Sequence, residues 1–319
     1  MPDSASDTPS DTPSDDPLPL DEVTRRLRDH VRSLARPAWQ PHTEAIADTS
    51  DAALRTASHF CGPPYIPVGT EWPLCECGQP LQLFLQLNLD ELPDEAKRQP
   101  GLGGSGLLQV FYHHVPADQP GGGECYAEPA WEAFDESHKT VRVVRPDGES
   151  ESTNRNNESD LEPARIVGWK SLDDVPVSDE AGIDFDYGRG TMQVSCDAIG
   201  LSRRLTDDDV VDGIPYLDYL FDDDDDDDGD DGDGDEAADA AGAASPLGGP
   251  RSRDKLGGWP KWVQDPDYPD CPDCGEPMTA VFQIDSEDHV DYMFGDCGTA
   301  HVFCCRTHPE IVTLSWGGS

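Results

Sequence analysis

The chain has 319 residues, of which 66 are acidic and 22 are basic, so its formal net charge at pH 7 is −44. This charge argues against direct binding to nucleic acid, because phosphate contacts require a basic stripe and the body of the chain shows none. Only five of the basic residues are lysines. Excess acid with few lysines is typical of halophilic proteins from a salt-saturated cytoplasm, where concentrated cations screen self-repulsion. The alternative is an acidic face that captures a basic protein partner or mimics nucleic acid.

Two acidic tracts are predicted to be disordered. Residues 1–16 hold five acidic residues and no basic one, and residues 222–239 hold thirteen acidic residues and no basic one. Such segments bury too little apolar surface to offset the entropy lost on ordering. We therefore expect a disordered acidic tail at 1–18 and a disordered acidic linker at 222–250.

The apolar content points to the cytoplasm. No secretory hydrophobic region follows Met1, and no apolar run approaches the roughly 18 residues of a membrane span, so we expect no membrane partner. Ten cysteines in a reducing compartment favour thiolate metal ligands or buried thiols over a disulfide framework.

An amphipathic helix is predicted directly after the acidic tail. Apolar residues recur there every three or four positions, at Leu20, Val23, Leu27, Val31 and Leu34. Pro37 ends the pattern. Five arginines between Arg25 and Arg36 make this the most basic stretch of the chain. The helix is interpreted as a lid docked on an acidic body, with a partner-binding helix as the alternative.

The most informative feature of the sequence is an internal repeat. CGQPLQLFLQLN from Cys77 aligns without a gap with CGEPMTAVFQID from Cys274. Two flanking blocks match in the same order: GPP from Gly62 with GWP from Gly258, and GLLQVFYHH from Gly106 with GTAHVFCCR from Gly298. Three blocks with similar spacing indicate a duplication.

The repeat predicts a mainly β (β-rich α+β) fold. Short apolar runs bounded by turn formers are expected as strands at 81–87, 107–112, 140–144, 165–169, 279–284 and 301–305. Repeat one spans about 58–115, an inter-repeat insertion about 116–221, and repeat two about 255–319. Each half alone has too little apolar sequence for its own core, so residues 19–319 are predicted to form one duplicated domain.

A structural zinc site is predicted near the carboxyl end. Cys271 and Cys274 form a CxxC turn followed by Gly275, and Cys305 and His308 supply a CxxH pair that a hairpin would return to the first pair. The predicted ligands are Cys271, Cys274, Cys305 and His308. Four protein ligands leave no open position for water, so Zn²⁺ would stabilise rather than catalyse. Buried inert thiols, a redox pair and a knuckle that has lost its metal remain alternatives, and Cys304 competes with Cys305 as ligand.

The first repeat carries a similar but less typical pattern of cysteines and histidines. Cys75 and Cys77 form a CxC turn, His113 aligns with Cys305, and His114 stands beside it. Cys75, Cys77, His113 and His114 are therefore a second candidate ligand set. If only three of them bind a metal ion, its open coordination position could activate water. This is the strongest basis for enzymatic activity in the sequence.

Several blocks along the chain resemble the YwqG-like family, a domain of unknown function. The resemblance rests on CGPPYIP, EWPLCECGQPLQLFLQLNLDELP, GLLQVFY, RIVGW, LGGWPKWVQ and CGEPMTAVFQIDSEDHVDYMFGDCGTAHVF. It implies a mainly β duplicated fold without established enzymatic activity, and an immunity-type or other protein-binding role. It also implies that the cysteine knuckles occur in only part of the family, which favours a structural metal.

The sequence therefore predicts a non-catalytic, zinc-stabilised binding or immunity-type module. A metal-dependent hydrolase using the first-repeat cysteines and histidines is the alternative. Neither the ligand, the partner nor the oligomeric state can be read from the sequence.

Overall fold

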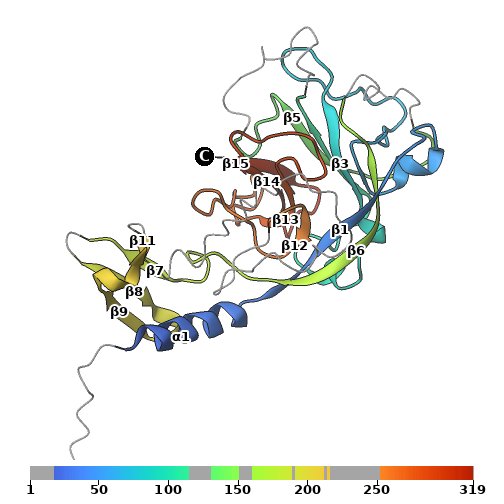
Figure 1. Cartoon of the computed structure of the whole chain (residues 1–319). Coiled ribbons are helices and arrows are strands. Elements are labelled where there is room, and N and C mark those ends of the chain that lie inside the picture. Colours follow the sequence, from blue (N-terminus) through green and yellow to red (C-terminus); the bar gives the residue numbers. More distant parts are fainter. Residues whose placement is uncertain are drawn as a thin grey trace, which may run out of the picture. The chain divides into compact units, whose positions relative to one another are not determined.

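The computed structural model describes residues 18–114, 131–150, 160–188, 191–211, 214–215 and 252–318 (Figure 1). The chain forms two compact units. The smaller comprises Met1–His30 and Gly182–Leu247, and the larger comprises Val31–Ala181 and Gly248–Ser319. The acidic tracts at 1–16 and 222–239, for which disorder was predicted, lie outside the described residues.

The larger unit is built on one antiparallel sheet of ten strands. Its strands are β1 (Arg36–Ala45), β2 (His59–Phe60), β3 (Gln82–Asn88), β4 (Leu107–Tyr112), β5 (Lys139–Val144), β6 (Ala164–Asp174), β12 (Lys255–Gly257), β13 (Thr279–Asp285), β14 (Thr299–Cys304) and β15 (Val312–Gly317). They are ordered β15-β14-β13-β12-β1-β6-β2-β3-β4-β5. The two outermost strands, β15 and β5, contact each other, so the sheet curls into a nearly closed barrel.

The sheet reproduces the internal repeat. Strands β2 to β5 form one meander and strands β12 to β15 form another, on either side of the long central pair β1 and β6. Both meanders carry a register shift at the aligned position, between Leu83 and Leu85 in β3 and between Ala280 and Phe282 in β13. The prediction of a mainly β, duplicated fold is confirmed. Strands β5 and β6 fall within the stretch 116–221 that the sequence analysis treats as an insertion.

The two halves are interlocked at the centre of the sheet. Strand β1 precedes the first meander in the chain but pairs with β12 of the second, and β6 precedes the second meander but pairs with β2 of the first. The pairing of β1 with β6 joins these two strands along their whole length. Neither meander is therefore completed by the long strand that precedes it in the chain.

The central strands of each meander are buried on both faces. All six residues of β4 and all six of β14 are buried, which explains why these strands read as continuous apolar runs rather than alternating ones. One face packs into the main core between the meanders. The other packs under the cysteine turn of its own repeat, around Leu81 and Phe111 in the first and Met278 and Phe303 in the second.

A buried ion pair fixes the end of β6 against β12. Lys255 Nζ lies 2.9 Å from Asp174 Oδ2, and both side chains have no exposed surface. Asp174 also accepts a hydrogen bond of 2.8 Å from the Trp259 backbone N–H. Gly258, at φ +74°, passes so close that an added Cβ would lie 2.3 Å from Asp174 Oδ2. Only glycine allows this approach with a left-handed backbone.

The smaller unit contains most of the predicted amphipathic helix, up to His30. Helix α1 (Leu20–Ser33) buries Val23 and Leu27 completely and exposes Arg25, as the 3.6-residue periodicity requires. Its other elements are β7 (Asp184–Asp186), β8 (Met192–Cys196), β9 (Leu201–Leu205), β10 (Val210–Val211) and β11 (Ile214–Pro215). Short 3₁₀ turns occur in both units at η1 (Ala52–Thr56), η2 (Leu89–Glu91), η3 (Ala96–Arg98), η5 (Asp197–Ile199) and η6 (Asp207–Asp209).

In the part of the chain that the structure describes, no helix has both the length and the apolar character needed to cross a bilayer. The nine cysteines in the described ranges are all free thiols.

Candidate metal centre

The second-repeat cysteines Cys271 and Cys274 are presented by a tight turn just before β13. The turn is closed by an isolated bridge between Asp270 and Pro277 and by a hydrogen bond of 2.8 Å from the Gly275 N–H to the Cys271 carbonyl. Gly275 adopts φ +70°, a left-handed conformation that a glycine reaches without steric cost. The sequence therefore folds locally so that both thiols point to one side of the turn.

The other two predicted ligands sit on the hairpin loop between β14 and β15. Cys305 directly follows β14, and its N–H donates to the Ile311 carbonyl at 3.1 Å, which closes the loop. Inside the loop, the His308 N–H donates to Cys305 Sγ at 3.3 Å. This bond is the backbone-to-sulfur contact that a thiolate ligand receives in a knuckle.

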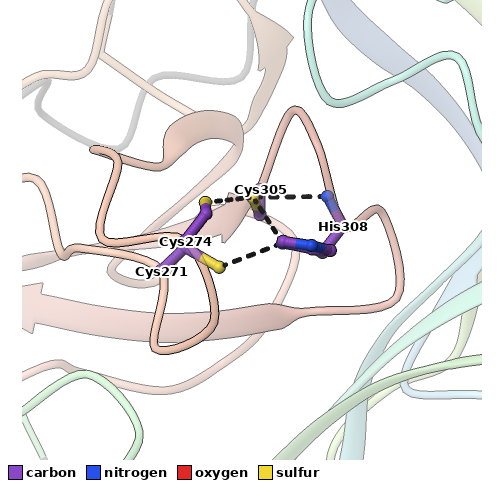
Figure 2. Close-up of side chains that lie close together, drawn as sticks. All are labelled: Cys271, Cys274, Cys305 and His308. Atoms are coloured by element: carbon purple, nitrogen blue, oxygen red, sulfur yellow. Dashed lines mark hydrogen bonds between the residues drawn. The ribbon is translucent and has the colours of Figure 1, made fainter.

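The four side chains converge on one point (Figure 2). Their ligand atoms all lie within 4.8 Å of one another. The closest pairs are Cys271 Sγ to His308 Nδ1 at 3.6 Å, Cys274 Sγ to Cys305 Sγ at 3.7 Å, and Cys305 Sγ to His308 Nδ1 at 3.8 Å. Metal–sulfur bonds of about 2.3 Å and metal–nitrogen bonds of about 2.0 Å give tetrahedron edges of about 3.5–3.8 Å. The cluster could hold a metal ion with little rearrangement.

Cys304 and Cys305 are adjacent but have opposite roles. Cys304 Sγ lies 3.7 Å from the Pro309 carbonyl, away from the cluster, and burial raises the pKa of this thiol to about 12. Burial also opposes ionisation of Cys305, but hydrogen bonds from the His308 and Thr307 backbone outweigh it and lower the pKa of the Cys305 thiol. Because successive strand residues face opposite sides, only Cys305 reaches the other ligands.

In the first repeat, the structure brings together three of the four predicted residues. The ligand atoms of Cys75, Cys77 and His113 lie within 4.8 Å of one another. His114 does not join them, because its Nε2 lies 2.6 Å from Asp160 Oδ1. His138, which the sequence analysis missed, places Nδ1 2.9 Å from Cys75 Sγ. No short spacing connects His138 to the cysteine turn, and only the pairing of β4 with β5 brings it there.

A third group of possible ligands, Asp254, Asp288 and His289, is an ion-pair network. His289 Nδ1 lies 3.0 Å from Asp254 Oδ2 and 3.3 Å from Asp288 Oδ2. Burial opposes the charge on His289, but the two carboxylates outweigh it and raise the pKa of His289 to about 9. The raised pKa favours the charged imidazole, which pairs with both carboxylates. The two carboxylates also accept backbone N–H bonds from Asp285 and Asp254, which ties this network to the fold.

A cavity of about 370 Å³ lies between the two meanders, beside the second-repeat cluster. Its buried apolar lining consists of Leu89, Leu102, Leu108, Val281, Cys304 and Val312. Two exposed charged residues of opposite sign, Arg145 and Glu310, also line it. Pro309 and Glu310 directly follow His308, so the loop that carries the cluster also forms one wall of the cavity.

Comparison with known proteins identifies the family. Residues 58–308 match the family described as "Domain of unknown function (DUF1963)". The chain belongs to this family. A search of curated proteins finds no match.

The match to the DUF1963 family covers most of what has been described. It includes both cysteine turns, Cys305 and His308, and every cavity residue except Pro309, Glu310 and Val312. It begins after β1, although the sheet needs β1 to join its halves. The family description assigns no activity.

Proposed function

We propose that this DUF1963 protein is a non-catalytic binding module whose second repeat is clamped by a structural zinc ion. The observation that carries the proposal is the convergence of Cys271, Cys274, Cys305 and His308 at tetrahedral spacing. The turn before β13 and the loop after β14 are far apart in the chain, and one ion bound to both would hold them together.

Zinc fits this donor set better than other common ions. Three thiolates and one imidazole are soft ligands that match the tetrahedral preference of Zn²⁺, whereas Mg²⁺ and Ca²⁺ require oxygen ligands. Four protein ligands complete the coordination sphere and leave no site for a reacting water. The ion would therefore add stability, about 4 kcal/mol when free zinc is about 1,000 times the dissociation constant.

The clamp supports binding because it shapes the adjacent cavity. A volume of about 370 Å³ lies within the usual range of roughly 300–1,000 Å³ for ligand pockets. The apolar lining suits an apolar side chain of a bound molecule. Arg145 and Glu310 can each form an ion pair with a charged group elsewhere on that molecule. We propose a basic protein partner that inserts such a side chain, in line with the net charge of −44 and with an immunity-type role.

The hydrolase alternative has less support. It requires an open coordination position among Cys75, Cys77, His113 and His114. The structure turns His114 toward Asp160 and places His138 against Cys75 instead. No contact among the described residues selects a general base beside this cluster.

Elemental analysis tests the zinc clamp. We expect Cys305→Ser to lose one zinc ion per chain and to unfold at a lower temperature. Cys297→Ser removes an exposed thiol outside the clusters and serves as the matched control, with full zinc content. Equal zinc content in both variants would refute the clamp.

Dye binding tests the cavity. The apolar anion 1-anilinonaphthalene-8-sulfonate should bind the wild-type protein saturably, with its sulfonate near Arg145. Gly104→Trp would fill the cavity from its rim, since a Cβ at Gly104 meets only Leu89 Cδ1, at 3.5 Å. We expect this variant to keep its zinc and to lose the dye. Unchanged dye affinity would show that the cavity is not a binding site.

A further inference from the structure

The cysteine turns of the two repeats have the same backbone frame. In each, the backbone N–H of the first cysteine donates to a carbonyl across the turn, and an isolated bridge closes the base. The matching hydrogen bonds are Cys75 N–H to the Gln79 carbonyl at 2.8 Å and Cys271 N–H to the Glu276 carbonyl at 2.9 Å. The matching bridges are Leu74 with Pro80 and Asp270 with Pro277. The first turn is thus folded as a knuckle despite its CxC spacing.

The hairpin facing each turn is also equivalent. His113 follows β4 as Cys305 follows β14, and each donates its N–H across the mouth of its hairpin. The bond runs from His113 to the His138 carbonyl at 2.8 Å and from Cys305 to the Ile311 carbonyl at 3.1 Å. The ligand-bearing parts of the second repeat therefore have counterparts in the same places in the first.

We propose that the first repeat holds a second metal ion, bound by Cys75, Cys77, His113 and His138. The turn supplies two thiols, and each strand of the hairpin supplies one imidazole at its end. The first three ligand atoms already lie within 4.8 Å of one another, with Cys77 Sγ 4.0 Å from His113 Nδ1. His138 Nδ1 lies 2.9 Å from Cys75 Sγ.

This last contact is shorter than an edge of a zinc-centred tetrahedron. A distance of 2.9 Å is that of a hydrogen bond between a thiol and an imidazole. With both groups bound to one ion, the separation is about 3.5 Å, so binding replaces the hydrogen bond. His138 does not belong to the group of atoms within 4.8 Å of one another, so its ring must also move toward Cys77 and His113. The protons of the Cys75 and Cys77 thiols leave to solvent as the ion enters.

Two thiolates and two imidazoles form a neutral complex with a divalent ion, and Zn²⁺ is the common metal of such a set. The set differs from the second-repeat cluster in its exposure. Cys75 and His138 are only 3% and 4% exposed, but Cys77 is an exposed residue. Solvent and competing chelators reach the ion through Cys77, so this centre releases its metal faster than the second-repeat centre.

His114 provides a matched control for His138. Both are histidines at the same hairpin, but His114 is paired with Asp160 at 2.6 Å and lies outside the cluster. We expect two zinc ions per chain in the wild-type protein and in His114→Ala. We expect one zinc ion per chain in Cys77→Ser and in His138→Ala. His138→Cys supplies a thiolate in place of the imidazole and should again bind two zinc ions per chain.

The readout uses cobalt as well as elemental analysis. Full-length protein reconstituted with Co²⁺ should show tetrahedral absorption for two ions, and Cys77→Ser should lose about half of it. Release to a chromogenic chelator should be biphasic, with the fast phase absent in Cys77→Ser and His138→Ala. The slow phase should be absent in Cys305→Ser, which assigns each phase to one repeat.

Different results would overturn the zinc clamp of the second repeat and the metal centre of the first repeat. One ion per wild-type chain, lost in Cys305→Ser and kept in Cys77→Ser, would overturn the second centre and leave the zinc clamp standing. Equal metal loss in His114→Ala and His138→Ala would overturn the assignment of His138. Retention of one ion in Cys305→Ser together with loss of that ion in the Cys77→Ser/Cys305→Ser double variant would support the second centre.

Discussion

The buried pair of Lys255 and Asp174 gives the sharpest test of how the two halves are held together. Both side chains have no exposed surface and lie 2.9 Å apart. Lys255→Met keeps the length of the side chain but removes the ion-pair partner of the buried Asp174 carboxylate. Removing one partner of such a pair destabilises a protein by about 3–5 kcal/mol, because an uncompensated charge remains in a medium of low dielectric.

The effect is large compared with typical total stabilities of about 5–15 kcal/mol. With a urea dependence of about 2–3 kcal/mol per molar, the unfolding midpoint should fall by about 1–2 M. Lys97→Met is the matched control. Lys97 is partly exposed and lies 4.0 Å from Asp94 Oδ1, so its loss should cost less than about 1 kcal/mol.

Urea unfolding followed by tryptophan fluorescence measures both variants. Trp259 reports on the affected region, because its backbone N–H donates to Asp174. A Lys255→Met midpoint within the error of the Lys97→Met midpoint would refute the reasoning. The double variant Lys255→Met/Asp174→Leu should recover part of the loss, since the buried charge is gone, although the Trp259 N–H then lacks its acceptor.

Three further predictions concern other parts of the larger unit. The pKa of His289, raised to about 9 from its ordinary 6.5, means that its stabilising charge is fully present below pH 6.5 and is lost as pH rises through about 9; His289→Gln should remove this decline in unfolding free energy. Gly258→Ala should destabilise the protein by more than about 2 kcal/mol, since the added Cβ would lie 2.3 Å from Asp174 Oδ2. The control Gly69→Ala, also at positive φ but with no atom within 4 Å of the added Cβ, should cost about 1 kcal/mol. Equal unfolding midpoints of the two variants would contradict the close approach at Gly258. Chelation should lower the thermal midpoint of the wild-type protein, whereas in Cys305→Ser the chelator should remove only what the first repeat binds; an unchanged wild-type midpoint would count against metal stabilisation.

Local patterns were enough for the elements with strong periodicity. The spacing of Leu20, Val23 and Leu27 predicts helix α1, and short apolar runs predict β3 and β4 with an error of about one residue at each end. Strand β1 was missed. Pro37 and Pro41 lie within it, and prolines argue against a strand because they donate no hydrogen bond to the ladder.

For the site, sequence spacing and tertiary contact contribute differently in the two repeats. CxxC and CxxH spacings predict all four second-repeat ligands, which the structure then brings within 4.8 Å of one another. In the first repeat, adjacency in sequence suggested His114, but strand pairing supplied His138. Neighbours in the chain alternate between the faces of a strand, so adjacency to His113 does not by itself direct a side chain toward Cys75 and Cys77.

The sequence alone determines the mainly β character and the cysteine turns, because both follow from short-range patterns of apolar and turn-forming residues. It also determines the duplication, because the matching blocks at Cys77 and Cys274 can be aligned without knowing the fold. Only the tertiary structure decides that β1 and β6 are exchanged between the halves, that Lys255 meets Asp174, and that a cavity opens beside the hairpin loop. These features join residues dozens to more than a hundred positions apart. Such contacts follow from the packing of the whole sheet and leave no regular spacing in the chain.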